Sequence, residues 1–266
     1  MKTLFQRAAG CLDACDPTEK VQLTQALYKD WCAGKLELDR TFKPEPIGEV
    51  GRPEKPKLVP PREVSKRSIN TEEGRVILCH ALAHIEFNAI NLALDAAYRF
   101  TDMPEQYYTD WLKVASEEAY HYTLLESYLN KRDHHYGDFD AHNGLWEMAQ
   151  VTAHDVLIRM GLVPRVLEAR GLDVTPGILK KLKQAKDPEF IEHLEIIHRD
   201  EIGHVAIGSH WFKYLCEQRN VDYQQTFKQL IQDYMKGSLR GPFDEVARLQ
   251  AGFSEQEIAD LNALEI

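Results

Sequence analysis

The chain has 266 residues, of which 44% are hydrophobic, and this is enough to build a sizeable core. Its formal net charge of −10, from 42 acidic and 32 basic residues, argues against a broad nucleic-acid surface and against attraction to an anionic membrane, but not against a small anionic substrate. The five cysteines form neither an even disulfide framework nor a paired Cys-x-x-Cys zinc pattern. We expect reduced thiols and, without a signal-like or membrane-spanning stretch, a cytoplasmic protein that does not enter a membrane.

The first 70 residues divide into two stretches. Residues 1–40 carry apolar residues at helical spacing and predict two short helices, the second starting near Asp16 and Pro17. Residues 41–70 contain six prolines between Phe42 and Arg62. Such a density forbids a continuous helix and leaves little capacity for sheet pairing. We therefore predict a Pro-rich extended arm.

The remaining residues carry a long helical pattern. Residues 71–217 predict four long helices that form one domain. Turn signals place the breaks between them at 101–104, 133–144, 171–177 and 187–188. Residues 218–266 predict C-terminal helices that pack on this domain, one of them near 223–235 and another after the candidate cap Ser254.

Two copies of Glu-x-x-His lie in the long helical region, each about 32 residues after a lone glutamate. Residues three apart on a helix share a face, so each copy presents a carboxylate and an imidazole to the same point. Two such pairs plus one glutamate from each of two further helices are the ligand set of ferritin-like di-iron and di-manganese bundles. We therefore predict an all-α, ferritin-like four-helix bundle with a dinuclear centre. Its predicted metal-binding and catalytic residues are Glu86, Glu118, His121, Glu168, Glu201 and His204.

The first pair of these helices supports a buried centre. Glu86 and Glu118 both lie 16 residues from position 102, so an antiparallel hairpin brings them to the same height. Their same-face neighbours are mainly apolar, and an inward carboxylate on such a face requires a cation or a hydrogen-bond network. Glu168 follows Gly161 and Pro164, which predict a kink just before it, and spacing alone does not fix its height.

Four sequence blocks carry a resemblance to a known family. They are His84-Ile-Glu86, Glu118-Ala-Tyr-His121, Leu167-Glu168-Ala-Arg170-Gly-Leu-Asp-Val-Thr-Pro176 and His198-Arg-Asp-Glu-Ile-Gly-His204. Together they resemble the ferritin-like family catalogued as domain of unknown function 455. That family is similar in turn to tRNA-modifying di-iron monooxygenases that hydroxylate an isopentenyl-type adenosine. The resemblance covers most of residues 65–217 and implies a non-haem di-iron, or manganese-containing, oxidoreductase with no settled substrate.

Several other polar residues have both a structural and a functional interpretation. Glu117 and Asp200 each precede a predicted ligand and could accept a hydrogen bond from a metal-bound imidazole. His84 and His198 could contact ligands or substrate, although a structural role is the more common one for such histidines. Arg170 and the lysines near position 183 could receive an anionic substrate, but a solvated helix face explains them as well.

The pattern favours an enzyme that activates dioxygen at two iron ions, or at manganese or a mixed Mn/Fe pair, and hydroxylates or oxidises an unidentified substrate. Oxygen and nitrogen ligands without a thiolate suit these metals. Expected partners are dioxygen, a small-molecule or modified-nucleoside substrate and an electron-donating reductase, and a homodimer is left open. The alternatives are a ferroxidase or iron-handling protein and a helical binding protein without catalysis. The sequence contains no Walker loop, dinucleotide fingerprint or nucleophile elbow.

Overall fold

The computed structural model describes residues 3–65, 68–235 and 239–263, and helices dominate it. Within those ranges β-structure is limited to two isolated bridges, Thr3 with Glu37 and Leu58 with Ala141. The predicted all-α class is confirmed. The chain separates into two compact units, residues 1–150 and 151–266, and each is described by itself.

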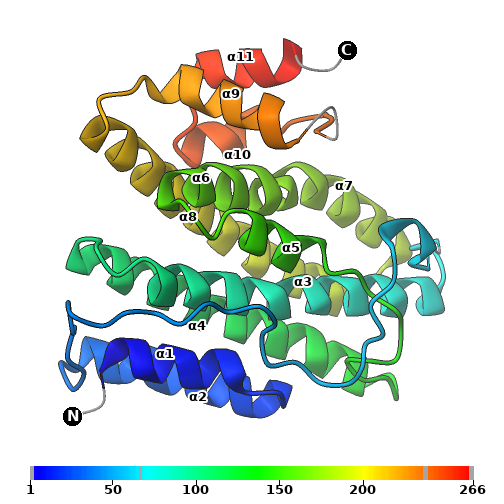
Figure 1. Cartoon of the computed structure of the whole chain (residues 1–266). Helices are drawn as coiled ribbons and strands as arrows, with labels where there is room; N and C mark the ends of the chain where they lie inside the picture. The colour runs from blue at the N-terminus through cyan, green and yellow to red at the C-terminus, as the bar shows by residue number, and fades with distance from the viewer. Residues whose placement is uncertain (1–2, 66–67, 236–238, 264–266) are drawn as a thin grey trace. The chain divides into compact units, whose positions relative to one another are not determined.

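The first unit is built on an antiparallel pair of long helices, α3 and α4. Helix α1 packs on α2 and α3, and α2 packs on α4 (Figure 1). The bounds are Leu4–Asp13 for α1, Pro17–Cys32 for α2, Glu72–Arg99 for α3, Glu105–Asn130 for α4 and Gly144–Val151 for α5, whose last residue belongs to the second unit. The two predicted N-terminal helices and the break near position 102 are therefore confirmed.

Local sequence signals explain where these helices begin. Thr3 forms a capping box with Gln6 at the start of α1, and the Asp16 side chain accepts from the backbone N–H of Glu19 at the start of α2. The Thr71 side chain caps α3 in the same way. These caps satisfy backbone N–H groups that have no partner within the helix.

A buried lysine joins the first three helices. Lys20 on α2 is completely buried, and its Nζ donates to the carbonyl oxygens of Cys11 at 2.8 Å and Leu12 at 3.0 Å. These carbonyls belong to the last turn of α1, where a positive charge is favourable. Nζ also donates to Oδ1 of Asn91 on α3 at 2.8 Å. One side chain thus fixes the end of α1 against α3.

The predicted Pro-rich arm is extended in the structure. Between α2 and α3 its described residues form one short 3₁₀ turn, Pro61–Glu63, and no α-helix. Two side chains hold the arm on the unit: the Trp146 indole donates to the carbonyl oxygen of Gly48 at 2.9 Å, and the backbone N–H of Glu45 donates to Tyr98 Oη at 2.9 Å.

Helix α3 is apolar along most of its length. Among the described residues, this helix is long and apolar enough to be a candidate for crossing a membrane. However, 78% of its most apolar 18-residue stretch is buried inside the structure. Burial of this extent is characteristic of the core helix of a folded domain.

The second unit is built around the long helix α8, Pro188–Gln218, against which the preceding helical segments pack. Those segments are α6, Val156–Leu162, a π-helical turn labelled η2, Val163–Glu168, and α7, Ala169–Ala185. Three helices follow α8: α9, Tyr223–Tyr234, α10, Glu245–Gln250, and α11, Glu255–Ala263. Figure 1 shows their order along the chain.

Some predicted boundaries in this unit need correction. The predicted break at 171–177 is wrong, because α7 runs through it with Pro176 in its interior. Burial of Leu172 and Leu182 on either side of this proline stabilises the helix and outweighs the lost backbone hydrogen bond. The short helix α10 was not predicted, whereas the irregularity before Glu168 is confirmed as the π-helical turn. The four-helix bundle and the 71–217 and 218–266 boundaries stay predictions.

Candidate metal centre

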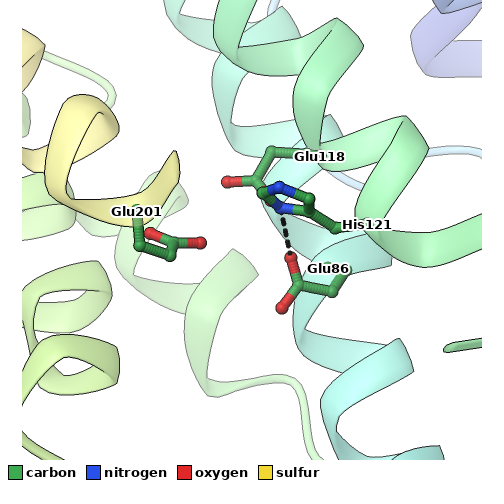
Figure 2. A group of neighbouring side chains, drawn as sticks. All are labelled: Glu86, Glu118, His121 and Glu201. Carbon is green, nitrogen blue, oxygen red and sulfur yellow. Dashed lines mark hydrogen bonds and ion pairs between the residues drawn. The ribbon is translucent and has the colours of Figure 1, made fainter. Parts of the chain in front are cut away.

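The helix pair α3 and α4 brings three predicted ligands of the first unit together. Glu86 is 4% exposed, and Glu118 and His121 are completely buried. One ligand atom from each lies within 4.8 Å of the others. His121 Nδ1 is 3.2 Å from Glu118 Oε2 and 3.3 Å from Glu86 Oε2 (Figure 2). Glu86, Glu118 and His121, called here the first half-site, therefore offer two carboxylates and one imidazole to a common point.

The position of the first half-site follows from the hairpin. Glu86 and Glu118 lie equally far from the turn between α3 and α4, as the sequence predicts, and so they meet deep in the unit. Apolar side chains cover this region of both helices. On α4 they include Trp111, Val114 and Leu125, and on α3 they include Ala83, Phe87 and Ile90. The packing that excludes water from the core thus also excludes it from the half-site.

The pKa shifts of Glu86 and His121 indicate that the first half-site lacks positive charge. Burial raises the pKa of Glu86 well above its usual value, and the neighbouring Glu118 carboxylate raises it further, whereas His121 opposes the rise. Burial lowers the pKa of His121, but the two carboxylates more than offset this and raise it to about 11. A metal cation would neutralise both carboxylates and displace the proton from the imidazole.

The donor set of the first half-site fits a metal ion. Carboxylate oxygens and an imidazole nitrogen are ligands of iron, manganese and zinc, and the absence of a thiolate among these three residues disfavours a structural zinc. When both carboxylates are ionised, the half-site carries a net negative charge even with His121 protonated, and burial makes that charge unfavourable. A dipositive ion removes that imbalance, and this is the physical reason to regard the half-site as a metal site.

The second unit carries the other Glu-x-x-His pair on α8. His204 is completely buried, the Glu201 side chain is 13% exposed, and His204 Nδ1 lies 3.8 Å from Glu201 Oε2. The buried residues Leu194, Ile197 and Val205 lie along the same helix. Figure 2 shows the Glu201 side chain projecting from α8, drawn in pale yellow. Sequence spacing therefore places both groups on one face of α8, as predicted.

Glu168 is the predicted ligand with the least regular backbone around it. It is the last residue of the π-helical turn η2, which packs on α8, and α7 begins directly after it. π-Helical turns are rare and occur frequently at functional sites. Glu168, Glu201 and His204, called here the second half-site, all belong to the second unit.

The acidic residues that precede Glu118 and Glu201 in the chain each form an ion pair. Glu117 forms an ion pair with Lys113 at 2.8 Å, and Asp200 forms one with Arg199 at 2.9 Å. Their predicted role as acceptors for metal-bound imidazoles stays a prediction.

His84 has a structural role. Its Nδ1 lies 2.8 Å from Tyr136 Oη, and its Nε2 lies 3.0 Å from the carbonyl oxygen of His142. These contacts join α3 to the loop after α4. The sequence could not identify this loop as the partner, because its histidines and tyrosine show no periodic pattern.

Comparison with known proteins identifies the family but not its activity. A relative from Haemophilus influenzae, described as an uncharacterized protein, is 45% identical over 264 residues, which cover 96% of this chain and 92% of that one. No solved structure matches the chain significantly. Residues 13–259 match the family model described as "Protein of unknown function (DUF455)". The chain therefore belongs to this family.

Proposed function

We propose that this protein is a non-haem oxidoreductase that holds two iron ions, or manganese in their place, and uses dioxygen to oxidise or hydroxylate a substrate. The observation that carries the proposal is the buried group of Glu86, Glu118 and His121, whose charges favour a cation. The repeated Glu-x-x-His pattern adds a second group, Glu168, Glu201 and His204, of the same donor types.

In this proposal the two half-sites together provide the six ligands of one dinuclear centre. This step depends on the sequence pattern, because four carboxylates and two imidazoles from four helical segments match the ligand set of di-iron carboxylate proteins. Two bound ions would supply the two electrons that activation of dioxygen requires. A reductase partner would return electrons after each turnover.

The chain's own residues would bind, orient and protect the site. Glu86 and Glu118 supply negative charge in a region that water does not reach, so their attraction for a cation is stronger than at the surface. His121 coordinates only after it loses its proton, and metal binding therefore releases a proton. The apolar residues around the half-site exclude water, which limits side reactions of an oxidised centre.

Metal analysis tests this proposal directly. Protein purified without chelator is assayed for iron and manganese per chain, and again after anaerobic loading with ferrous ion. We expect about two metal ions per wild-type chain, consistent with the paired ligand sets, and a loss of metal in Glu118→Ala. Glu192→Ala removes an exposed glutamate from α8 and should bind metal as the wild type does.

Two further outcomes separate the alternatives. Exchange coupling between two bound iron ions, measured by Mössbauer spectroscopy, is expected for one shared centre. Two uncoupled ions would contradict that shared centre. A wild-type chain that binds no metal under either condition would refute the oxidoreductase and leave a helical binding protein.

A further inference from the structure

A buried arginine lies three residues before Glu168 in the π-helical turn. The Arg165 side chain is completely buried, and its Nη2 donates to Glu257 Oε1 on α11 at 2.7 Å. Its Nε donates to Ser209 Oγ on α8 at 3.1 Å. Three aromatic rings surround the guanidinium carbon at 4.2 to 4.8 Å from their centroids, those of Phe212, Phe227 and Phe253. Arg165 is therefore held by charge, hydrogen bonds and ring faces at once.

A second buried ion pair lies five residues after Glu168. The Asp173 side chain on α7 is completely buried and accepts from Arg248 Nε at 2.9 Å and from Arg248 Nη2 at 2.8 Å. Asp173 Oδ1 also accepts from the backbone N–H of Asp244, the residue that caps α10, at 3.0 Å. Glu168 thus lies in the chain between two residues that are each tied to the C-terminal helices.

The two ion pairs share the aromatic ring of Phe253. The Phe253 centroid is 4.4 Å from the Arg165 guanidinium carbon and 4.9 Å from that of Arg248. While Glu257 Oε1 accepts from Arg165, its Oε2 accepts from the backbone N–H of Ser254 at 2.9 Å and closes the first turn of α11. A displacement of α11 would therefore disturb the Arg165 end of the segment that carries Glu168, and a displacement of α10 would disturb its Asp173 end.

Such an arrangement is costly if its only role is stability. Apolar residues of similar volume stabilise a core at least as well as a buried ion pair in many proteins, because each buried charge must first lose its water. Ion pairs and bidentate contacts do, however, fix direction and register more tightly than apolar contacts. Two of them on either side of one glutamate fix the path of the backbone through that residue.

We propose that residues 244–257, called here the C-terminal clamp, position Glu168 for metal binding through Arg165 and Asp173. Arg165, Asp173, Arg248 and Glu257 are thus positioning residues that act through the backbone of the π-helical turn. The proposal rests on the proposed role of Glu168 as a metal ligand, and it adds that the C-terminal helices set the affinity of the second half-site.

The test uses the full chain and cobaltous ion, whose visible absorption reports the geometry of its ligands. Glu257→Gln and Asp173→Asn each break one arm of the clamp, and Glu168→Gln removes the ligand itself. We expect both clamp variants to bind one Co²⁺ as the wild type does and the other about 10- to 100-fold more weakly, the usual effect of losing a group that orients a ligand. Their absorption should change in the same direction as that of Glu168→Gln.

A matched control separates positioning from stability. Leu182→Ala removes a completely buried side chain from α7 without touching either ion pair, so it should lower the denaturation midpoint and leave Co²⁺ affinity and absorption unchanged. If circular dichroism shows that Glu257→Gln does not fold, a double variant that combines Arg165→Met with Glu257→Gln takes its place. It removes the unpaired arginine charge, and we expect the same changes in Co²⁺ affinity and absorption.

The outcomes distinguish the two proposals. Clamp variants that lose stability but bind both Co²⁺ ions with wild-type affinity and absorption would overturn the clamp and leave the metal centre intact. A wild-type chain that binds no Co²⁺ would overturn both. Weakened binding in the clamp variants, with normal binding in Leu182→Ala, would support both.

Discussion

Pro164 in the π-helical turn lies directly against Gly208 on α8, where a β-carbon would come within 2.3 Å of Pro164 Cβ and 2.4 Å of its Cγ. No real β-carbon tolerates such a contact, so the turn or the helix would have to move. The approach of these two residues brings the backbone just before Glu168 close to the helix that carries Glu201 and His204.

Replacement of Gly208 by alanine should therefore destabilise the protein. We expect the free energy of unfolding to fall by about 1–3 kcal/mol, the usual cost of forcing an extra group into a packed core. Urea denaturation followed by circular dichroism measures this. Gly203→Ala, on the same helix, meets no atom within 4 Å and should instead stabilise by up to about 1 kcal/mol through helix propensity. Equal effects of the two substitutions would contradict the close approach.

Acid should destabilise the first unit through His80. Burial lowers the pKa of His80 to about 4, with a further lowering by His84 and His134 and an opposing effect of Asp138. Its Nε2 accepts from the backbone N–H of Gly137 at 2.9 Å, which requires the neutral ring. In the unfolded chain this histidine has an ordinary pKa near 6.5, so between pH 6.5 and 4 the unfolded state binds more protons than the folded state. The contribution of neutral His80 to the free energy of unfolding is therefore fully present above pH 6.5 and is lost as the pH falls to 4.

The measurement for His80 is the free energy of unfolding at several pH values between 7 and 4. The wild type should lose up to about 3 kcal/mol from this histidine, which corresponds to the fall in its pKa. His80→Gln removes the titrating group, and the difference between the two proteins should shrink as the pH falls. A constant difference would show that His80 does not carry the acid sensitivity.

Glu86 should stabilise the metal-bound protein and destabilise the metal-free one. Because burial and Glu118 raise the pKa of Glu86, its charged form is unfavourable in the folded state without a cation. We expect Glu86→Gln to raise the free energy of unfolding by about 1–3 kcal/mol in chelator and to abolish most of the stabilisation that added ferrous or manganous ion gives the wild type.

Glu192→Gln provides the comparison for Glu86, since it removes one exposed negative charge and no buried one. Its stability in chelator should equal that of the wild type, and added metal should stabilise it normally. If Glu86→Gln were instead less stable than the wild type in chelator, the carboxylate would have a structural role that does not depend on a metal.

The hydrogen bond between His84 and Tyr136 should contribute measurably to the first unit. Tyr136→Phe removes the hydroxyl that lies 2.8 Å from His84 Nδ1. We expect a loss of about 1 kcal/mol in the free energy of unfolding, the typical contribution of one side-chain hydrogen bond. Tyr120→Phe removes a hydroxyl from a tyrosine that is 45% exposed and should have almost no effect. A smaller effect of Tyr136→Phe than of Tyr120→Phe would refute the contribution.

Much of the fold could be predicted because the relevant signals are local. Helix caps such as Asp16, the prolines of the arm and the equal distances of Glu86 and Glu118 from position 102 all follow from short-range chemistry. The first half-site could be predicted for the same reason, since the geometry of a hairpin of two helices is set by counting residues.

The remaining features depend on contacts between residues far apart in the chain. Pro176 looks like a helix end, but burial of Leu172 and Leu182 keeps α7 continuous. Arg165 and Arg248 look like ordinary basic residues of an acidic chain, because their partners Glu257 and Asp173 lie 92 and 75 residues away. Three phenylalanines of the second unit surround the Arg165 guanidinium, and their arrangement has no periodic signature in the sequence.

The contacts of Glu257 with Arg165 and Ser254 affect the order in which parts of the chain can fold during synthesis. The chain emerges from the ribosome with its N-terminus first, so Glu86, Glu118 and His121 appear well before Glu257. The first unit contains all the residues of its half-site, so these residues are all present before the second unit has been synthesised. The π-helical turn must wait for α11, which pairs with Arg165 only after residue 257 has appeared. If both half-sites bind metal as proposed, the ligands of the first are therefore complete before the C-terminal clamp can position Glu168 in the second.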